Sequence, residues 1–256
     1  MTYPIRVGAQ CRPQHTDYRT MRDAWLRAEE AGVDALFNWD HFFPLSGEPE
    51  GTHFECWTML GAMAEVTERP QIGALVTCNG YRNPELLADM ARTVDHVSGG
   101  RVILGIGSGW FERDYDEYGY TFGTAPDRLR ELGAALPRIR SRLERLNPAP
   151  LGSVPIMIGG KGPRVTLRLT AEHAAIWHGF GAPEEWAASS AILDEWCSKL
   201  GRDPGEIERS VTVQDAHADR IDDFVQAGAT LLVAGIDGPE FDLSLVERLV
   251  RYRDAR

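Results

Sequence analysis

The stretch that decides the fold covers residues 82–122 and reads RNPELLADMARTVDHVSGGRVILGIGSGWFERDYDEYGYTF. Asn83 is a favourable N-cap and Pro84 a favourable first helical residue, so residues 84–97 are predicted to form a helix. Two glycines end that helix, and the apolar residues 102–106 that follow are predicted to form a strand. A helix joined to an apolar strand by a short glycine turn is typical of α/β proteins built from repeated strand–helix units.

The same alternation continues along the whole chain. Strands are predicted at residues 5–9, 35–39, 71–76, 102–106, 155–158, 174–178, 210–213 and 230–234. Helices are predicted at residues 16–31, 55–65, 84–97, 127–145, 163–172, 183–200, 219–227 and 243–253. Eight strand–helix units in 256 residues predict a single (β/α)8 TIM barrel that spans residues 1–256, with a doubly wound open sheet as the alternative.

Composition excludes several kinds of partner. The formal net charge of −11 argues against nucleic acid and anionic membranes, since both need a basic surface. No apolar run approaches the ~20 residues that cross a bilayer, and the opening MTYPIRVG is unlike a secretion signal, so a cytoplasmic location is expected. The four cysteines form no C-x-x-C pair, which predicts reduced thiols and no metal site.

Small residues follow two of the predicted strands, where a TIM barrel carries its active site. Backbone N–H groups in such turns are free to bind an anion, and a helix start strengthens this binding. One of the two lysines of the chain lies in the second turn, and Pro163 fits the first turn of the helix predicted after it. The candidate anion-binding residues are Gly107, Ser108, Gly109, Gly160, Lys161 and Gly162.

Asp40 and His41 follow the second predicted strand. An imidazole beside a carboxylate can act as a general acid or base, although a histidine that only caps a loop is the simpler structural interpretation. Trp110, Trp177 and His178 also follow predicted strand ends, where they could line a pocket or pack in the core.

Residues 82–122 resemble the luciferase-like flavin and deazaflavin oxidoreductases, especially the branch that uses coenzyme F420. The resemblance lies in RNPxLLA, in SGGR, in GxGxGW and in the acidic and aromatic run after it. It implies a luciferase-like barrel that binds F420 and transfers a hydride to or from a small organic substrate, and it makes a homodimer possible. One alternative is an FMN-dependent monooxygenase that uses reduced flavin and O2. Another, from a different class, is a phosphate-binding lyase or isomerase, or a non-catalytic binding barrel.

The resemblance also implies roles for particular residues. His41 would assist proton transfer, and Asp40 would hydrogen-bond the cofactor ring and orient His41. A non-prolyl cis peptide is expected at Ala74–Leu75, within one or two residues. The cofactor-binding residues would be Asp40, Ala74, Leu75, Thr77, Gly107, Ser108, Gly109, Trp110, Gly160, Lys161, Gly162 and Trp177.

Two departures from the family pattern limit what can be carried over. Trp110 occupies the position where the sugar-phosphate dehydrogenases of the family have a glutamate that acts as an acid, so glucose 6-phosphate is not expected to be the substrate. The segment between the fourth and fifth predicted strands is shorter than in typical relatives, which predicts a more open substrate pocket.

Overall fold

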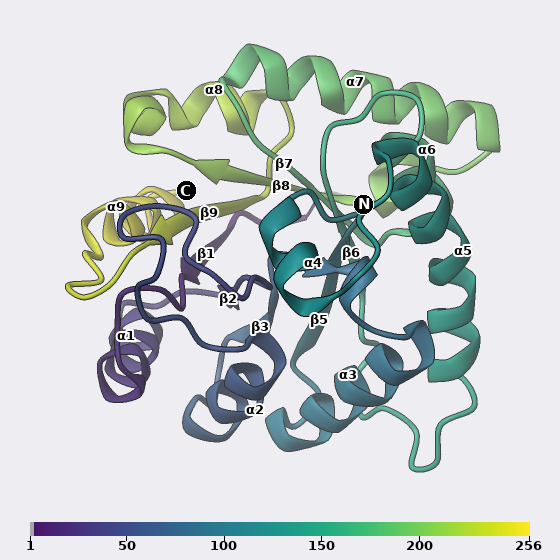
Figure 1. Ribbon diagram of the computed structural model, residues 1–256. Helices are drawn as coiled ribbons and strands as arrows, with labels where there is room; N and C mark the ends of the chain where they lie inside the picture. The colour runs from purple at the N-terminus through teal and green to yellow at the C-terminus, as the bar shows by residue number, and fades with distance from the viewer. Residues whose placement is uncertain (1–2) are drawn as a thin grey trace.

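The computed structural model describes residues 3–256 as a ring of helices around a closed parallel barrel (Figure 1). The strands are β1 (Arg6–Cys11), β2 (Ala35–Asn38), β3 (Gln71–Ala74), β4 (Thr77–Cys78), β5 (Val102–Gly107), β6 (Ile156–Gly159), β7 (Ile176–Gly179), β8 (Glu208–Val213) and β9 (Leu231–Ile236). The helices are α1 (Tyr18–Glu30), α2 (Cys56–Val66), α3 (Pro84–Ser98), α4 (Glu112–Tyr118), α5 (Ala125–Leu143), α6 (Thr166–His173), α7 (Pro183–Leu200), α8 (Ile221–Gln226) and α9 (Ser244–Asp254), with 3-10 turns η1 (Asn79–Tyr81), η2 (Pro204–Glu206) and η3 (Asp215–Arg220).

Strand pairing closes the sheet on itself. The order is β3-β2-β1-β9-β8-β7-β6-β5-β4, and β3 also pairs with β5. Because β3 and β4 are two halves of the third barrel strand, the nine segments make eight barrel strands, all parallel. The predicted luciferase-like TIM barrel is therefore confirmed, and an open sheet is excluded.

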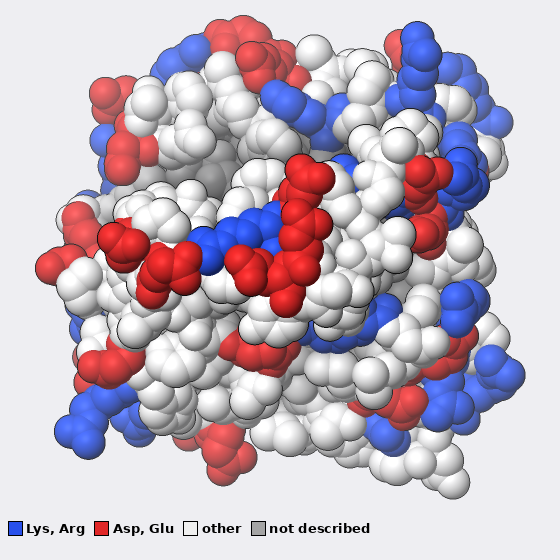
Figure 2. Space-filling view, in the orientation of Figure 1, with Lys and Arg blue, Asp and Glu red and all other residues white. Residues whose placement is uncertain are grey.

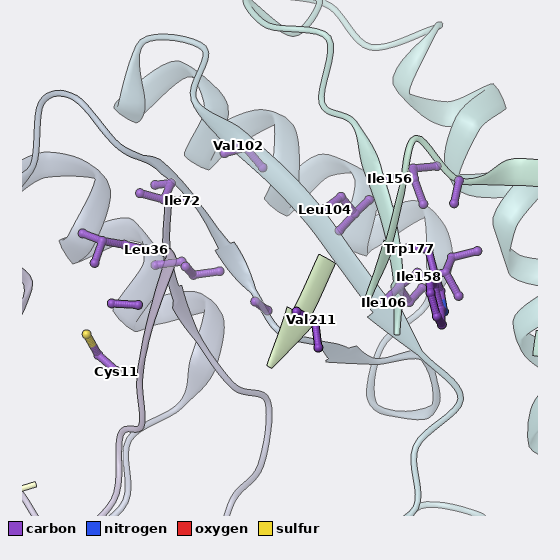
Figure 3. Close-up of a cluster of buried hydrophobic side chains, with 14 of the residues drawn as sticks. Cys11, Leu36, Ile72, Val102, Leu104, Ile106, Ile156, Ile158, Trp177 and Val211 are labelled. Atoms are coloured by element: carbon purple, nitrogen blue, oxygen red, sulfur yellow. The ribbon is translucent and has the colours of Figure 1, made fainter. Parts of the chain in front are cut away.

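Two apolar layers hold the barrel together, as the period of two along each strand requires. Phe37 and Ile103 point into the barrel, where they pack with Met157 and Val233. Their sequence neighbours point outward and pack under the helices; Figure 3 shows part of this outer layer, including Leu36 and Leu104. Each fully buried side chain of this size contributes about 1.5–3 kcal/mol through the apolar area it removes from water.

The third strand differs from its prediction over residues 71–76. It stops at Ala74 and resumes at Thr77, and the cis peptide joins Leu75 to Val76, one residue beyond the expected position. Glycines on neighbouring strands leave room for this bulge. A Cβ at Gly107 would lie 2.8 Å from a Val76 methyl, and one at Gly159 would lie 3.0 Å from the other.

Two helices near the barrel mouth also differ from prediction. The helix expected to start at Pro163 starts at Thr166, after a turn over residues 163–165. The acidic and aromatic run forms α4, a separate short helix that was not predicted, and Figure 1 shows it lying in front of the strands. No helix within residues 3–256 has the length and apolar character that a membrane crossing requires.

Candidate active site

A cavity of about 610 Å³ opens where the barrel strands end. Its wall takes residues from the carboxyl ends of most strands and from the loops that follow them, which is where TIM barrels place their active sites. The lining residues are Gln10, Trp39, Asp40, His41, Leu45, Leu75, Val76, Thr77, Cys78, Tyr81, Gly107, Ser108, Gly109, Trp110, Gly159, Gly160, Thr166, His178, Phe180, Thr212 and Gln214.

His41 reaches this cavity with one ring nitrogen held and the other free. Its Nδ1 lies 2.7 Å from Oδ2 of Asp114, a fully buried carboxylate on α4. Its Nε2 has no hydrogen-bond partner within residues 3–256 and is not one of their buried unpaired atoms, so it is an accessible atom of a residue that lines the cavity. The ring edges of His41 meet Trp39, Trp110 and Phe111 at centroid distances of 5.6, 5.8 and 5.6 Å.

Asp40 lines the cavity, and both of its carboxylate oxygens are already held by groups of the protein. Both its oxygens accept from Arg82, at 2.6 and 3.0 Å, and one also accepts from the backbone N–H of Cys78 at 2.9 Å. Arg82 also pairs with Glu55, 2.6 Å away. Burial alone would lower the pKa of Arg82, but these carboxylates raise it. Asp40 therefore contacts the end of β4 directly and the start of α2 through Arg82 and Glu55, and the carboxylate that contacts His41 is Asp114.

The first glycine turn lines the cavity and has unpaired backbone donors. Within residues 3–256 the backbone N–H groups of Ser108, Gly109 and Trp110 have no hydrogen-bond acceptor. Gly109 has φ +81°, and a Cβ there would lie 2.1 Å from the Tyr115 hydroxyl. Arg128 holds the turn from behind by donating to the Gly109 carbonyl at 3.1 Å. This turn presents donors to the cavity in a backbone shape that favours glycine.

The second glycine turn only partly matches its prediction. Gly160 lines the cavity, but its N–H donates to the His178 carbonyl at 3.0 Å. Lys161 and Gly162 lie outside the wall, and Lys161 pairs with Glu185 at 3.0 Å and lies over the Phe180 ring. The turn over residues 163–165 separates these residues from α6, so it is Thr166 that reaches the cavity.

Two further expected cofactor residues are also outside the wall. Trp177 is fully buried, stacks on Trp186 at 5.2 Å, and donates its indole N–H to the Gly160 carbonyl at 2.8 Å. Ala74 is buried beneath the bulge, which presents Leu75 and Val76 to the cavity instead. Both are core residues that support the site from behind.

The wall includes several residues that sequence reasoning did not assign to the cofactor site. Tyr81 is the most important of them, because its hydroxyl donates at 2.8 Å to Asp114, a fully buried carboxylate behind the wall that holds His41 and was not assigned either. Asp114 lies within residues 82–122, the segment with the family resemblance, and Tyr81 directly precedes it, but nothing in the sequence marks Asp114 as the partner of His41. Gln10, Thr212 and Gln214 lie at or just after strand ends, a position that the barrel prediction already marked.

No lysine or arginine lines this cavity among the described residues, and most of its titratable groups are uncharged near neutral pH. Burial lowers the pKa of His178 to about 3, and its two ring nitrogens contact the hydroxyls of Ser210 and Thr212 at 2.8 and 2.9 Å. Burial raises the pKa of the Cys78 thiol to about 11 and also raises the pKa of Tyr81. The wall therefore combines neutral polar groups with the aromatic faces of Trp39, Trp110 and Phe180.

A second depression, about 780 Å³, lies between α1 and the start of α9. Four carboxylates and one arginine, Arg27, make up its charged lining, and it lies away from the strand ends. Within residues 3–256 no three His, Cys, Asp or Glu side chains are grouped so that they could hold a metal ion.

A closed parallel barrel with a histidine and a donor-rich glycine turn at its carboxyl mouth is the arrangement of a TIM-barrel enzyme site. The chain belongs to the luciferase-like monooxygenase family, whose model matches residues 1–241.

Curated relatives include enzymes of the F420-dependent kind. An F420-dependent glucose-6-phosphate dehydrogenase of Microbacterium testaceum (strain StLB037) is 29% identical over 235 residues, which cover 84% of this chain and 69% of the relative. A 5,10-methylenetetrahydromethanopterin reductase of Archaeoglobus fulgidus (strain ATCC 49558 / DSM 4304 / JCM 9628 / NBRC 100126 / VC-16) is 27% identical over 225 residues, which cover 82% of this chain and 63% of the relative. The chain thus spans about two thirds of the length of these two relatives.

The fold is also similar to that of solved structures. An F420-dependent secondary alcohol dehydrogenase, solved with an F420-acetone adduct, superposes with a TM-score of 0.85 at 16% identity and covers 97% of this chain and 98% of that one. At this identity the likeness establishes the fold alone.

Proposed function

We propose that the protein is an F420-dependent oxidoreductase that transfers a hydride between the deazaflavin and a small organic substrate. The observation that carries this proposal is the meeting, in one cavity, of unpaired backbone donors at residues 108–110 and the accessible Nε2 of His41. The F420-dependent relatives support the choice of cofactor.

The residues present fit a planar cofactor that carries a phosphate. The turn at Ser108 and Gly109 would hold the phosphate through backbone N–H groups, with the Thr166 hydroxyl on the other side. The bulge at Leu75 and Val76 would support the ring from the barrel side, because these apolar side chains form the floor of the cavity. These contacts would come from backbone N–H groups, a hydroxyl and apolar side chains, so they need no lysine or arginine in the cavity wall.

His41 would manage the proton in this reaction. When bound, the deazaflavin supplies or accepts the hydride, so the substrate must gain or lose a proton as well. His41 can take or give that proton at Nε2, because Asp114 already holds Nδ1. Trp110, whose side chain is 62% exposed, and Leu45 lie at the mouth, where a bound substrate would exclude water against them.

The proposal is tested by titrating F420 into the purified protein and following its fluorescence, with FMN and NADPH as competitors. We expect saturable F420 binding that FMN does not reverse. Displacement of F420 by FMN at similar concentrations would favour the reduced-flavin monooxygenase instead. Absence of F420 binding well above micromolar concentration would refute the proposal.

A further inference from the structure

Asp114 is a buried charge in unusual surroundings. Its side chain is fully inaccessible, yet it accepts three hydrogen bonds, from three parts of the chain. Oδ1 accepts from the Phe42 backbone N–H at 3.0 Å, while Oδ2 lies 2.7 Å from His41 Nδ1 and 2.8 Å from the Tyr81 hydroxyl. Burying a carboxylate costs free energy unless such donors satisfy it. The presence of one beside the accessible histidine therefore needs an explanation.

We propose that Asp114 is the positioning residue of the site: it holds His41 as the Nδ1–H tautomer and so turns the Nε2 lone pair toward the cavity. Tyr81 fixes the carboxylate from its other side. The role of His41 in proton transfer rests on the function proposed above, whereas the tautomer of His41 is a property of the protein alone.

The chemistry of the two partners decides the tautomer. An ionised carboxylate only accepts hydrogen bonds, so the close contact with Asp114 requires a hydrogen on Nδ1 of a neutral His41. The second ring nitrogen then carries a lone pair, which is the form that can remove a proton from a substrate. Tyr81 strengthens this arrangement because its hydroxyl donates to the same oxygen that His41 uses.

The other groups that face His41 do not compete for this role. Trp39, Trp110 and Phe111 present aromatic rings to it, and none of them accepts a proton. His53 lies behind Trp39 and receives its indole N–H at 3.0 Å; burial, together with the neighbouring His41, lowers the pKa of His53 to about 4. Burial and the nearby Cys78 and Asp114 raise the pKa of Tyr81, so it stays a hydroxyl donor.

The first test is the ¹⁵N NMR spectrum of histidine-labelled protein without cofactor, at a pH where His41 is neutral. The expected spectrum shows His41 protonated on Nδ1 and bare on Nε2, with His41→Gln used to assign the signal. A spectrum with the hydrogen on Nε2 would overturn the proposal, whether or not the protein binds F420. This separates the inference from the choice of cofactor.

The second test uses Asp114→Asn, which keeps the size of the side chain and removes its charge. We expect the Nδ1–H tautomer to lose its dominance and kcat to fall about 10- to 1000-fold, while F420 affinity changes less than about threefold. Tyr81→Phe should keep the tautomer and lower kcat about 2- to 10-fold, since only one donor is lost. Asp116→Asn, an exposed acid on the same helix, is the matched control and should change neither.

If Asp114 only stabilised the fold, its substitution would have a different effect. Asp114→Asn would then lower thermal stability while the His41 tautomer and kcat of the folded fraction stayed unchanged, and this result would overturn the proposal. If Asp114→Asn fails to fold, the wild-type spectrum and the Tyr81→Phe variant still decide the matter.

Discussion

His41 and Asp114 are 73 positions apart in sequence, yet their side chains meet at 2.7 Å at the mouth of the barrel. One residue earlier, Asp40 also lines the cavity, but its carboxylate pairs with Arg82. Neighbours in sequence thus have different partners here. His41 faces the cavity, and Asp40 holds the structure beneath it.

Replacing His41 by alanine tests its role at the reacting atoms. The change removes the only ring nitrogen that we assign to proton transfer, so turnover should fall about 10²- to 10⁴-fold while F420 affinity stays within a few-fold. Steady-state kinetics and F420 titration measure the two quantities separately. His96→Ala, at the far end of α3, should behave like the parent protein. Loss of F420 binding in His41→Ala would instead place His41 in the cofactor pocket.

The Asp40–Arg82 pair should matter for stability. Arg82→Met leaves the fully buried Asp40 with only the Cys78 N–H as a donor, so the free energy of unfolding should fall by about 3–5 kcal/mol. Chemical denaturation measures this loss. Adding Asp40→Asn should recover part of it, because the unpaired charge is gone. Arg138→Met breaks an exposed pair with Glu85 and should have little effect. Equal losses in the two single variants would contradict the assigned role.

Local patterns could identify His41 but not its partner. A histidine at a strand end in a predicted barrel is a candidate from position alone, and the family resemblance adds to this. The partner comes from a helix whose packing over the mouth depends on tertiary contacts: the Phe42 ring packs against those of Tyr81 and Tyr118, at centroid distances of 4.8 and 4.0 Å. Such a pairing has no signature in a single sequence, so the adjacent Asp40 looked like the better candidate.

At the level of elements, the turn after β5 and the helix α4 form one unit over the cavity. Figure 2, in the orientation of Figure 1, shows acidic side chains gathered over α4, with a basic side chain beside them. Glu112, Asp116 and Glu117 are exposed there, whereas Arg113 pairs with Glu50 and donates to the Pro49 carbonyl at 2.9 Å. Arg113 thus ties α4 to the loop over residues 43–50, whose Leu45 lines the cavity.

Gly109→Ala tests whether the shape of this turn is required. A Cβ at residue 109 would lie 2.1 Å from the Tyr115 hydroxyl and 2.6 Å from Cys78 Sγ, on a backbone with φ +81°. The free energy of unfolding should fall by about 2–5 kcal/mol, from left-handed strain and from displaced neighbours. F420 affinity should fall as well, since the donors at residues 108–110 move.

Gly119→Ala is the matched control for that change. Gly119 also has a positive φ, +70°, but a Cβ there would meet no atom within 4 Å. It should therefore lose only about 1 kcal/mol and keep its F420 affinity. If both alanine variants bind F420 as well as the parent protein, the turn after β5 does not hold the cofactor.

Periodicity predicted the elements of the barrel better than it predicted the elements at its mouth. The helix predicted at residues 84–97 is found at Pro84–Ser98, because Asn83, Pro84 and Gly99 cap it locally. The third strand could not be predicted in two pieces, since its bulge depends on glycines at residues 107 and 159 of other strands. Local capping is visible in a sequence, whereas close approach between distant strands is not.

For the whole molecule, folding buries one histidine in the wall of a mostly neutral cavity and partly buries another behind that wall. His178 lies on β7 with its ring between the hydroxyls of Ser210 and Thr212 from β8, and His53 lies under Trp39. Burial lowers the pKa of both rings, so both are neutral in the folded protein near neutral pH. The unfolded chain would protonate both in mild acid, so folding and pH are linked.

Stability should therefore decline as the pH falls below the ordinary histidine pKa. Burial lowers the pKa of His178 from 6.5 to about 3, and burial together with His41 lowers that of His53 to about 4. Between 6.5 and these values the unfolded chain binds more protons than the folded one, so the free energy of unfolding rises with pH and falls as acid is added.

Each histidine should contribute a slope of about 1 kcal/mol per pH unit between about pH 6 and pH 5. Urea unfolding at several pH values measures that slope, and His178→Gln should reduce it by one histidine's share. An unchanged slope in His178→Gln would mean that His178 takes up a proton in the folded barrel. The claim that the cavity wall is mostly neutral would then be wrong.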